Sequence, residues 1–144
     1  MALFNVRVYG IMINEKREVL VMDEYIRGGY YTKFPGGGLE FGEGTLECMT
    51  REWQEELQQE IDIVEHLYTT DFFQISAFDN ESQIISIYYR VAPRSPFVAR
   101  VSDKPFDFEI PEGSTEIAGA RWIAWDDFSP AAVTLPIDKV VAGL

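Results

Sequence analysis

The chain has 144 residues, of which 47% are apolar and 25% are charged, a balance typical of one soluble domain spanning residues 1–144. The formal net charge of -12 repels phosphate backbones and argues against a polynucleotide partner. No apolar run is long enough to cross a bilayer, and the single cysteine fits a reducing compartment. We therefore expect a cytoplasmic protein with no membrane partner.

The first part of the sequence predicts three strands. Residues 4–13 and 19–25 are rich in β-prone apolar side chains and are separated by a polar break, so we expect an antiparallel pair. Residues 30–34 read as a short aromatic strand, which residues 35–38 (Pro-Gly-Gly-Gly) end in a tight turn.

The clearest helix is predicted from Thr45 to about Ile61. Thr45 can cap its start, and Glu47 favours the positive first turn. Four apolar side chains recur at helical spacing and form a narrow stripe that should face the core: Leu46, Met49, Trp53 and Leu57.

Beyond the helix, the pattern predicts two strands, a loop-rich stretch, a late strand and a short closing helix. The two strands are residues 63–73 and 83–91, and the loop-rich stretch is residues 93–113. The late strand is residues 116–125, and the closing helix is residues 136–142. Strands interrupted by helices make a mixed α/β protein, and the spacing favours a mainly antiparallel or mixed sheet.

Three carboxylates share one face of the predicted helix. Glu52, Glu55 and Glu56 stand at i, i+3 and i+4, so their side chains project from neighbouring positions and repel one another. Hard cations such as Mg²⁺ or Mn²⁺ would remove that repulsion and use the oxygens as ligands. A carbonyl of the preceding glycine run can point at the same ions.

Two further charged residues have a spacing that could hold this face in position. Arg51 is next to Glu52, and Glu43 lies eight residues earlier in the loop. An ion pair between Glu43 and Arg51 would tie the loop to the helix. A metal-binding carboxylate face fits the needs of diphosphate cleavage, which requires neutralisation of the phosphate charge and a metal-activated water in line with the leaving group.

These residues resemble the Nudix box: a glycine, five residues, a glutamate, seven residues, then Arg-Glu-apolar-any-Glu-Glu-any-Gly-apolar. Gly37, Glu43 and the run from Arg51 to Glu56 stand at those positions. Gln58 replaces the final glycine, and Gln59 replaces the apolar residue after it. Because glycine normally lets the chain leave a helix, Gln58 predicts that the helix continues for about one more turn.

The resemblance implies a fold and an activity. The fold is an α+β structure, the Nudix-type α/β/α sandwich around a mixed β-sheet. The activity is metal-dependent hydrolysis of the diphosphate (pyrophosphate) linkage in a small molecule, a nucleoside diphosphate linked to another moiety X. The family often forms homodimers, so a homodimer is one expectation for the oligomeric state.

The resemblance also implies roles for particular residues. Two or more Mg²⁺ or Mn²⁺ ions would be held by carboxylates of the helix and one carbonyl: Glu52, Glu55, Glu56 and the Gly36 oxygen. Arg51 would orient Glu52 and pair with Glu43. The general base would be a helix carboxylate or an acidic residue near the late strand, for which Glu116 is preferred over its rivals Glu109 and Glu112.

Several residues have plainer interpretations. Cys48 is expected to be a packed apolar side chain, because no partner histidine is near it in the sequence. His66 lies between apolar residues and is expected to be structural or exposed rather than catalytic. Tyr30, Tyr31 and Phe34 could stack on a base, but core packing is the favoured interpretation. The alternative function is a non-catalytic Nudix-fold sensor or regulator that binds a nucleotide without hydrolysing it.

Overall fold

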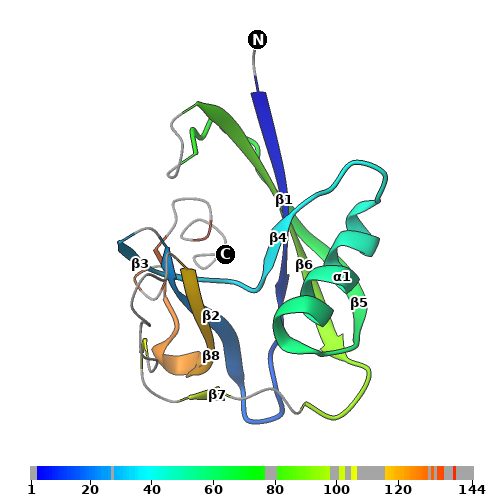
Figure 1. Ribbon diagram of the computed structural model, residues 1–144. Coiled ribbons are helices and arrows are strands. Elements are labelled where there is room, and N and C mark those ends of the chain that lie inside the picture. The colour runs from blue at the N-terminus through cyan, green and yellow to red at the C-terminus, as the bar shows by residue number, and fades with distance from the viewer. Residues whose placement is uncertain are drawn as a thin grey trace. The chain divides into compact units, whose positions relative to one another are not determined.

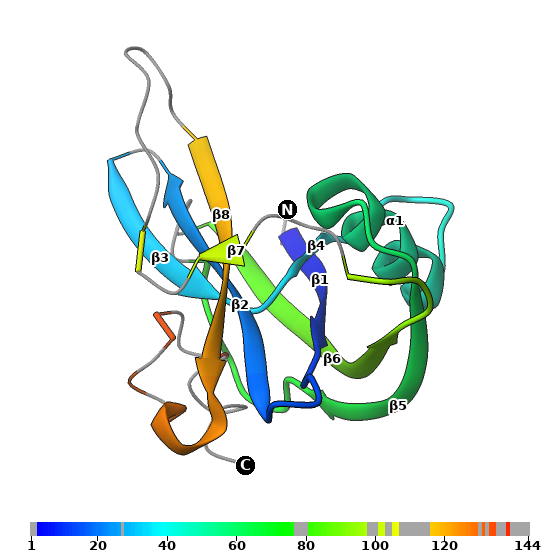
Figure 2. The ribbon, with the colours of Figure 1, turned by 90° about the horizontal axis from the view of Figure 1, so that it is seen from below.

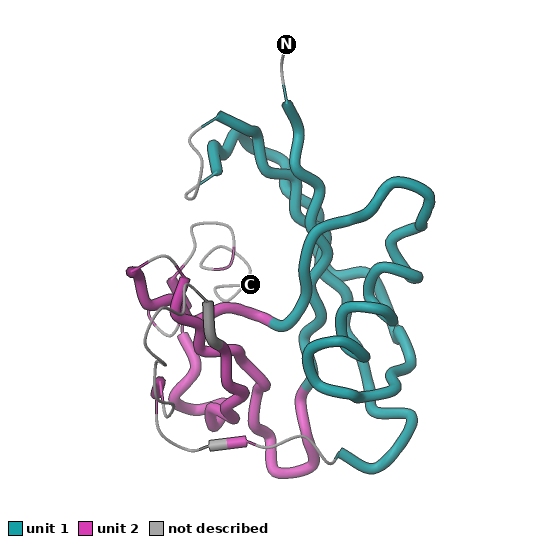
Figure 3. Tube along the Cα trace, viewed as in Figure 1, with its two compact units in different colours: residues 1–12, 35–98 teal, residues 13–34, 99–144 magenta. Residues whose placement is uncertain are grey.

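The structure is a computed structural model that describes residues 3–26, 28–76, 81–97, 101–102, 105–106, 116–129, 131, 133–134 and 138. The chain divides into two compact units (Figure 3), residues 1–12 with 35–98 and residues 13–34 with 99–144. The elements in chain order are shown in Figure 1: β1 (Leu3–Ile11), β2 (Glu18–Ile26), β3 (Gly29–Lys33), β4 (Gly36–Gly38), α1 (Thr45–Leu57), β5 (Ile61–Thr69), β6 (Ser82–Pro93), β7 (Val101–Ser102), β8 (Glu116–Ala124) and η1 (Trp125–Asp127).

The first unit combines α1 with a four-stranded sheet in the order β4-β1-β6-β5. β1 runs parallel to β6 and antiparallel to β4, while β5 is antiparallel to β6, so the sheet is mixed. Trp53 of α1 is fully buried, and its indole packs so closely on Gly10 of β1 that a Cβ there would lie 2.6 Å from Nε1. This contact fixes the helix against the sheet.

The second unit contains a sheet in the order β3-β2-β8-β7, in which β3, β2 and β8 lie side by side (Figure 2). β2 is antiparallel to both β3 and β8, and β7 is parallel to β8. The central strand is buried from Val19 to Asp23, as expected for a strand with a neighbour on each side. The mixed α+β fold class predicted from the sequence is confirmed by these two mixed sheets and α1.

The predicted pairing of the first two strands is wrong. β1 and β2 belong to different sheets. Where the hairpin was expected, Ile13 and Val19 form an isolated antiparallel bridge. A polar break between two β-prone segments resembles a hairpin turn, but β1 pairs with β4 and β6, and β2 pairs with β3 and β8. The predicted turn at residues 35–38 is also wrong in part, because Gly36–Gly38 is a strand paired with β1.

Both ends of the helix differ from the prediction. Gly44, not Thr45, is the N-cap, and Glu47 Oε1 accepts a 3.1 Å hydrogen bond from the Gly44 N–H. At the other end, the helix does not continue to Ile61 but stops at Leu57. Gln58 itself adopts the left-handed conformation (φ 48, ψ 39), so the chain turns as it would at glycine.

The apolar stripe and the C-terminal elements also need comment. Met49, Trp53 and Leu57 are buried as predicted, but Leu46 is 52% exposed and Cys48 takes its place in the core. The predicted closing helix at residues 136–142 lies outside the described residues except for Asp138, so the second helical layer stays a prediction. Within the part of the chain that is described, no helix is long and apolar enough to cross a membrane.

Candidate active site

The Glu52 carboxylate is held against the backbone of β4. A Cβ on Gly37 would overlap that carboxylate, and a Cβ on Gly36 would come within 2.7 Å of the Tyr9 Cα in β1. At Gly36 a side chain would collide with the backbone of β1, so glycine is required there, whereas at Gly37 a side chain would displace the Glu52 carboxylate. The glycines bring the Glu52 side chain, which is 12% exposed, next to the strand that carries the Gly36 carbonyl.

Arg51 is the centre of a hydrogen-bond network around this carboxylate. Its Nε and Nη2 bind the two oxygens of Glu43 at 3.0 and 2.7 Å, which is the bidentate geometry that arginine favours. Nη2 also donates to the Gly38 carbonyl at 3.1 Å. Nη1 donates to Glu52 at 3.0 Å and to Glu55 at 3.2 Å. The predicted Glu43–Arg51 ion pair is therefore present, and one guanidinium connects the loop, β4 and two carboxylates of α1.

Electrostatics keeps the Glu43–Arg51 pair ionised. The Arg51 guanidinium lowers the pKa of Glu43 from 4.5 to about 2, helped by the backbone N–H of Glu40, which donates to Glu43 at 2.9 Å. In return, the hydrogen bond from Glu43 raises the pKa of Arg51. Both groups are charged at any pH at which the protein would work, so the pair is a permanent anchor.

The three helix carboxylates differ in their access to solvent. The Glu52 side chain is 12% exposed and the Glu55 side chain 59% exposed, and Glu56 is also exposed. Carboxylate and carbonyl oxygens are the ligands that Mg²⁺ and Mn²⁺ prefer, and Glu52 already lies against β4. The donor chemistry therefore fits a hard divalent cation. As placed, no three acidic, histidine or cysteine side chains of the described residues converge on one ion position.

Comparison with known proteins identifies the family. The sequence model of the NUDIX domain matches residues 3–144. The chain belongs to the NUDIX family. No curated protein matches it.

Solved structures with this fold include a NUDIX hydrolase from Nitrosomonas europaea, with a TM-score of 0.66 and 19% identity over 96% of this chain and 85% of that one. A MutT NUDIX hydrolase from Burkholderia pseudomallei has a TM-score of 0.63 and 16% identity, over 96% and 95% of the two chains. A UDP-X diphosphatase has a TM-score of 0.65 and 15% identity, over 99% of this chain and 62% of that one. These likenesses show that the Nudix chain has the family's fold.

The other predicted site residues of the Nudix chain belong to the second unit or are not described. Glu116 is the first residue of β8, in the second unit, and its backbone pairs with Ile26. Glu109 and Glu112 lie outside the described residues. The choice of general base among these three and the helix carboxylates therefore stays a prediction.

The residues expected to be structural are placed accordingly. Burial, with the nearby Glu43 charge, raises the pKa of Cys48 to about 12, so its thiol is not a nucleophile. His66 is exposed and shares a 2.7 Å hydrogen bond with Thr69. Phe34 is buried, whereas Tyr30 is 53% exposed, so the expected core packing is correct for Phe34 and wrong for Tyr30.

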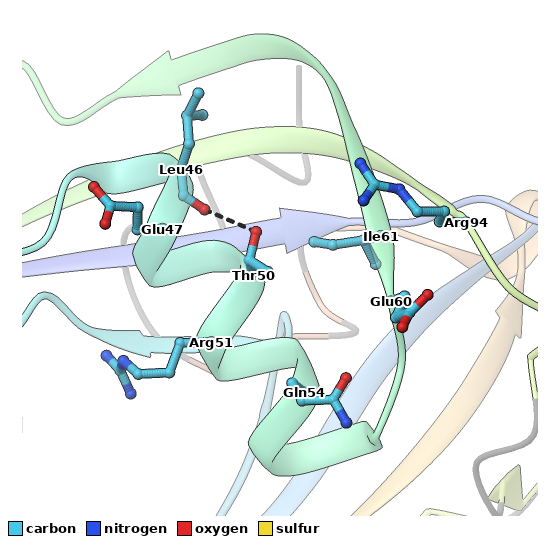
Figure 4. A pocket seen from close by; sticks show the side chains of 8 residues that line it. All are labelled: Leu46, Glu47, Thr50, Arg51, Gln54, Glu60, Ile61 and Arg94. Carbon is cyan, nitrogen blue, oxygen red and sulfur yellow. Dashed lines mark hydrogen bonds between the residues drawn. The ribbon is translucent and has the colours of Figure 1, made fainter.

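Sequence reasoning missed two features. The Gly38 carbonyl is a partner of Arg51, and the signal was its position directly after the two glycines of the motif. A groove of about 610 Å³ also lies beside α1, lined by Thr50, Arg51 and Gln54 of the helix together with Ile61 and Arg94 (Figure 4). Arg51 therefore borders both the groove and the carboxylate face, whereas Glu52, Glu55 and Glu56 do not line the groove.

Proposed function

We propose that this Nudix protein is a metal-dependent pyrophosphohydrolase that cleaves the diphosphate of a nucleoside diphosphate linked to another moiety X. The observation that carries the proposal is the position of the Glu52 carboxylate, which is fixed between the Gly37 backbone and the Arg51 guanidinium at the start of a carboxylate face. Two structures with the same fold, a UDP-X diphosphatase and a MutT NUDIX hydrolase, are in keeping with this substrate class.

Each residue of the network would have a separate task. Mg²⁺ or Mn²⁺ ions, when bound, neutralise the diphosphate and lower the pKa of a water molecule. Glu52, Glu55, Glu56 and the Gly36 carbonyl would hold two or more such ions. Arg51 would keep Glu52 oriented while Glu43 keeps Arg51 in place. A carboxylate of the helix, or Glu116, would accept the proton of the attacking water.

The proposal extends to partners and organisation. The substrate would be a small molecule rather than a polynucleotide or a membrane, because the net charge of -12 repels extended anionic surfaces. The family match runs continuously over residues 3–144, which supports one domain made from both units. A cytoplasmic location and a homodimer are further proposals that depend on the same family membership.

The test is release of phosphate and pyrophosphate from nucleoside triphosphates, nucleotide sugars and dinucleoside polyphosphates. Each compound is assayed with Mg²⁺, with Mn²⁺ and with a chelator. We expect turnover of at least one class with metal and none with chelator. Metal-independent nucleotide binding without turnover would overturn the proposal in favour of the sensor or regulator.

A variant series then tests the residue assignments. Glu52→Gln and Glu56→Gln each keep the shape of the side chain but remove its charge, so turnover should fall by about two orders of magnitude or more while the fold persists. Glu60→Gln is the matched control, because Glu60 is an exposed acidic residue at the groove. Near-normal rates in both Glu52→Gln and Glu56→Gln would show that the metal assignment is wrong.

A further inference from the structure

Arg51 interacts with two groups of partners through different nitrogen atoms. Nε and Nη2 face Glu43 and the Gly38 carbonyl, whereas Nη1 lies within hydrogen-bond distance of both Glu52 and Glu55. The first group anchors the arginine to the loop and to β4. The second places a permanent positive charge between two of the carboxylates that are proposed to bind metal.

We propose that Arg51 is a built-in counter-ion, which binds the carboxylates of Glu52 and Glu55 when no metal is bound. It competes with the metal for these two carboxylates. This inference rests on the proposed metal site. The anchor to Glu43 keeps Arg51 in place when metal arrives, so Glu55 is the group that moves. Its bond to Nη1 is the longest of the five hydrogen bonds that Arg51 makes to Glu43, Glu52, Glu55 and Gly38, and its side chain is 59% exposed.

The electrostatic argument has two parts. Without metal, three neighbouring carboxylates on one helix face would repel one another, and the guanidinium at Glu52 and Glu55 offsets this repulsion. With metal, the same positive charge opposes a divalent cation at the same oxygens. Arg51 therefore stabilises the metal-free protein and weakens metal binding, and Glu43 limits the second effect by neutralising the arginine from the other side.

A positioning role and a counter-ion role of Arg51 predict opposite changes in metal affinity when the arginine is removed. If Arg51 only holds Glu52 in position, removing it disorders the carboxylate and weakens metal binding. If Arg51 is a competing counter-ion, removing it strengthens metal binding and lowers the thermal stability of the metal-free protein. The direction of the change in affinity therefore separates the two roles without any measurement of turnover.

The experiment is a calorimetric titration of the full chain with Mn²⁺, after removal of metal, on the wild type, Arg51→Gln and Arg94→Gln. Arg94→Gln removes the same charge from an exposed ion pair with Asp62 and so corrects for the change in net charge. We expect Arg51→Gln to bind Mn²⁺ about tenfold more tightly and Arg94→Gln to change the affinity less than about twofold. Unchanged or weaker binding in Arg51→Gln overturns the inference.

A second comparison covers the case in which Arg51→Gln does not fold. Glu43→Gln and the double variant Glu43→Gln/Arg51→Gln both lack the anchor, so neither holds Glu52 through it. The inference predicts tighter Mn²⁺ binding in the double variant than in Glu43→Gln, and equal affinities overturn it. If the wild type itself binds no Mn²⁺, the proposed metal-dependent function fails, which is a distinct outcome from a wrong sign.

Discussion

Arg121 and Arg51 both bind carboxylates, but the surroundings of the two arginines differ. In the second unit, Arg121 binds both oxygens of Asp23 at 2.8 and 3.0 Å, and Asp23 is 2% exposed. In the first unit, Arg51 is shared among carboxylates whose exposure rises from Glu52 to Glu55. The same charged groups are buried in one place and exposed in the other, so exposure rather than composition separates the structural cluster around Asp23 from the proposed metal-binding cluster around Arg51.

Asp23 shows what a saturated carboxylate looks like. Besides Arg121, it accepts hydrogen bonds from the Thr32 hydroxyl at 2.7 Å and from the Phe106 N–H at 3.1 Å. These partners tie β2 to β3, to β8 and to the segment around Phe106, which has a positive φ of 53. No acceptor position of Asp23 is left for a ligand, whereas Glu55 has a large solvent-exposed surface.

The largest expected effect comes from breaking the buried Asp23–Arg121 ion pair. Asp23→Asn leaves the mostly buried Arg121 charge without its partner, so the free energy of unfolding should fall by about 3–5 kcal/mol, measured by urea denaturation. Asp62→Asn is the control, because its ion pair with Arg94 is exposed and should contribute about 1 kcal/mol or less. Mn²⁺ affinity of folded Asp23→Asn should not change; a weaker affinity with normal stability would contradict the comparison.

The second prediction disturbs the cluster of carboxylates around Arg51 without removing a charge. Gly37→Ala places a methyl group where the Glu52 carboxylate lies, so that carboxylate must move. Turnover should fall by about 100-fold, because small displacements of catalytic groups are costly. In Gly38→Ala the nearest atom to the new methyl is Arg7 Nη1 at 3.6 Å, an ordinary contact, so the loss should be much smaller. Equal losses would show that Gly37 is not specifically required.

The third prediction concerns acid. The pKa of Glu43 is lowered in the folded protein from 4.5 to about 2, so its ion pair with Arg51 stabilises the protein above about pH 4.5 and loses that effect as the pH falls towards 2. The difference in unfolding free energy between wild type and Glu43→Gln should therefore shrink over this interval. Denaturation curves at several pH values between 6 and 2 measure it. A difference that stays constant with pH would mean that the pair contributes no stability.

The smallest expected effect is at the end of the helix. Gln58 adopts a left-handed conformation that favours glycine, so Gln58→Gly should raise the free energy of unfolding by about 1 kcal/mol. Gln58→Ala keeps a Cβ and should stay within about 0.5 kcal/mol of the wild type. Equal stability of the glycine and alanine variants would show that the cap carries no strain. Thermal unfolding with the Tm as readout is sufficient for both.

Local chemistry in the sequence predicted the helix, the family and the Glu43–Arg51 pair. Each depends on residues of one continuous segment, Gly37 to Gln59, where the sequence spacing is informative about which side chains meet. The same logic failed at Gln58, where the packing of the chain after the helix overrides the preference of a non-glycine residue against positive φ. It also failed at Leu46, because helical periodicity alone does not show where along the helix the core ends.

Long-range pairing could not be predicted from the sequence. Nothing local in β1 indicates that it pairs with β6, and three glycines in a row suggest a turn more readily than the strand β4. The predicted network around Arg51 lacked two contacts for the same reason. The Gly38 carbonyl and the contact of Glu52 with Gly37 exist only once β4 has docked beside β1.

The pairing of β1 with β6 also has a consequence for how the protein folds. During synthesis, β1 must wait until the segment from Ser82 has left the ribosome, and β2 must wait longer for β8. Closing such long loops costs entropy before any contact offsets it, so folding should take milliseconds to seconds rather than microseconds. The helix α1, by contrast, can form early, so its glutamates would be exposed on the nascent chain before β5 and β6 have completed the sheet that contains β4.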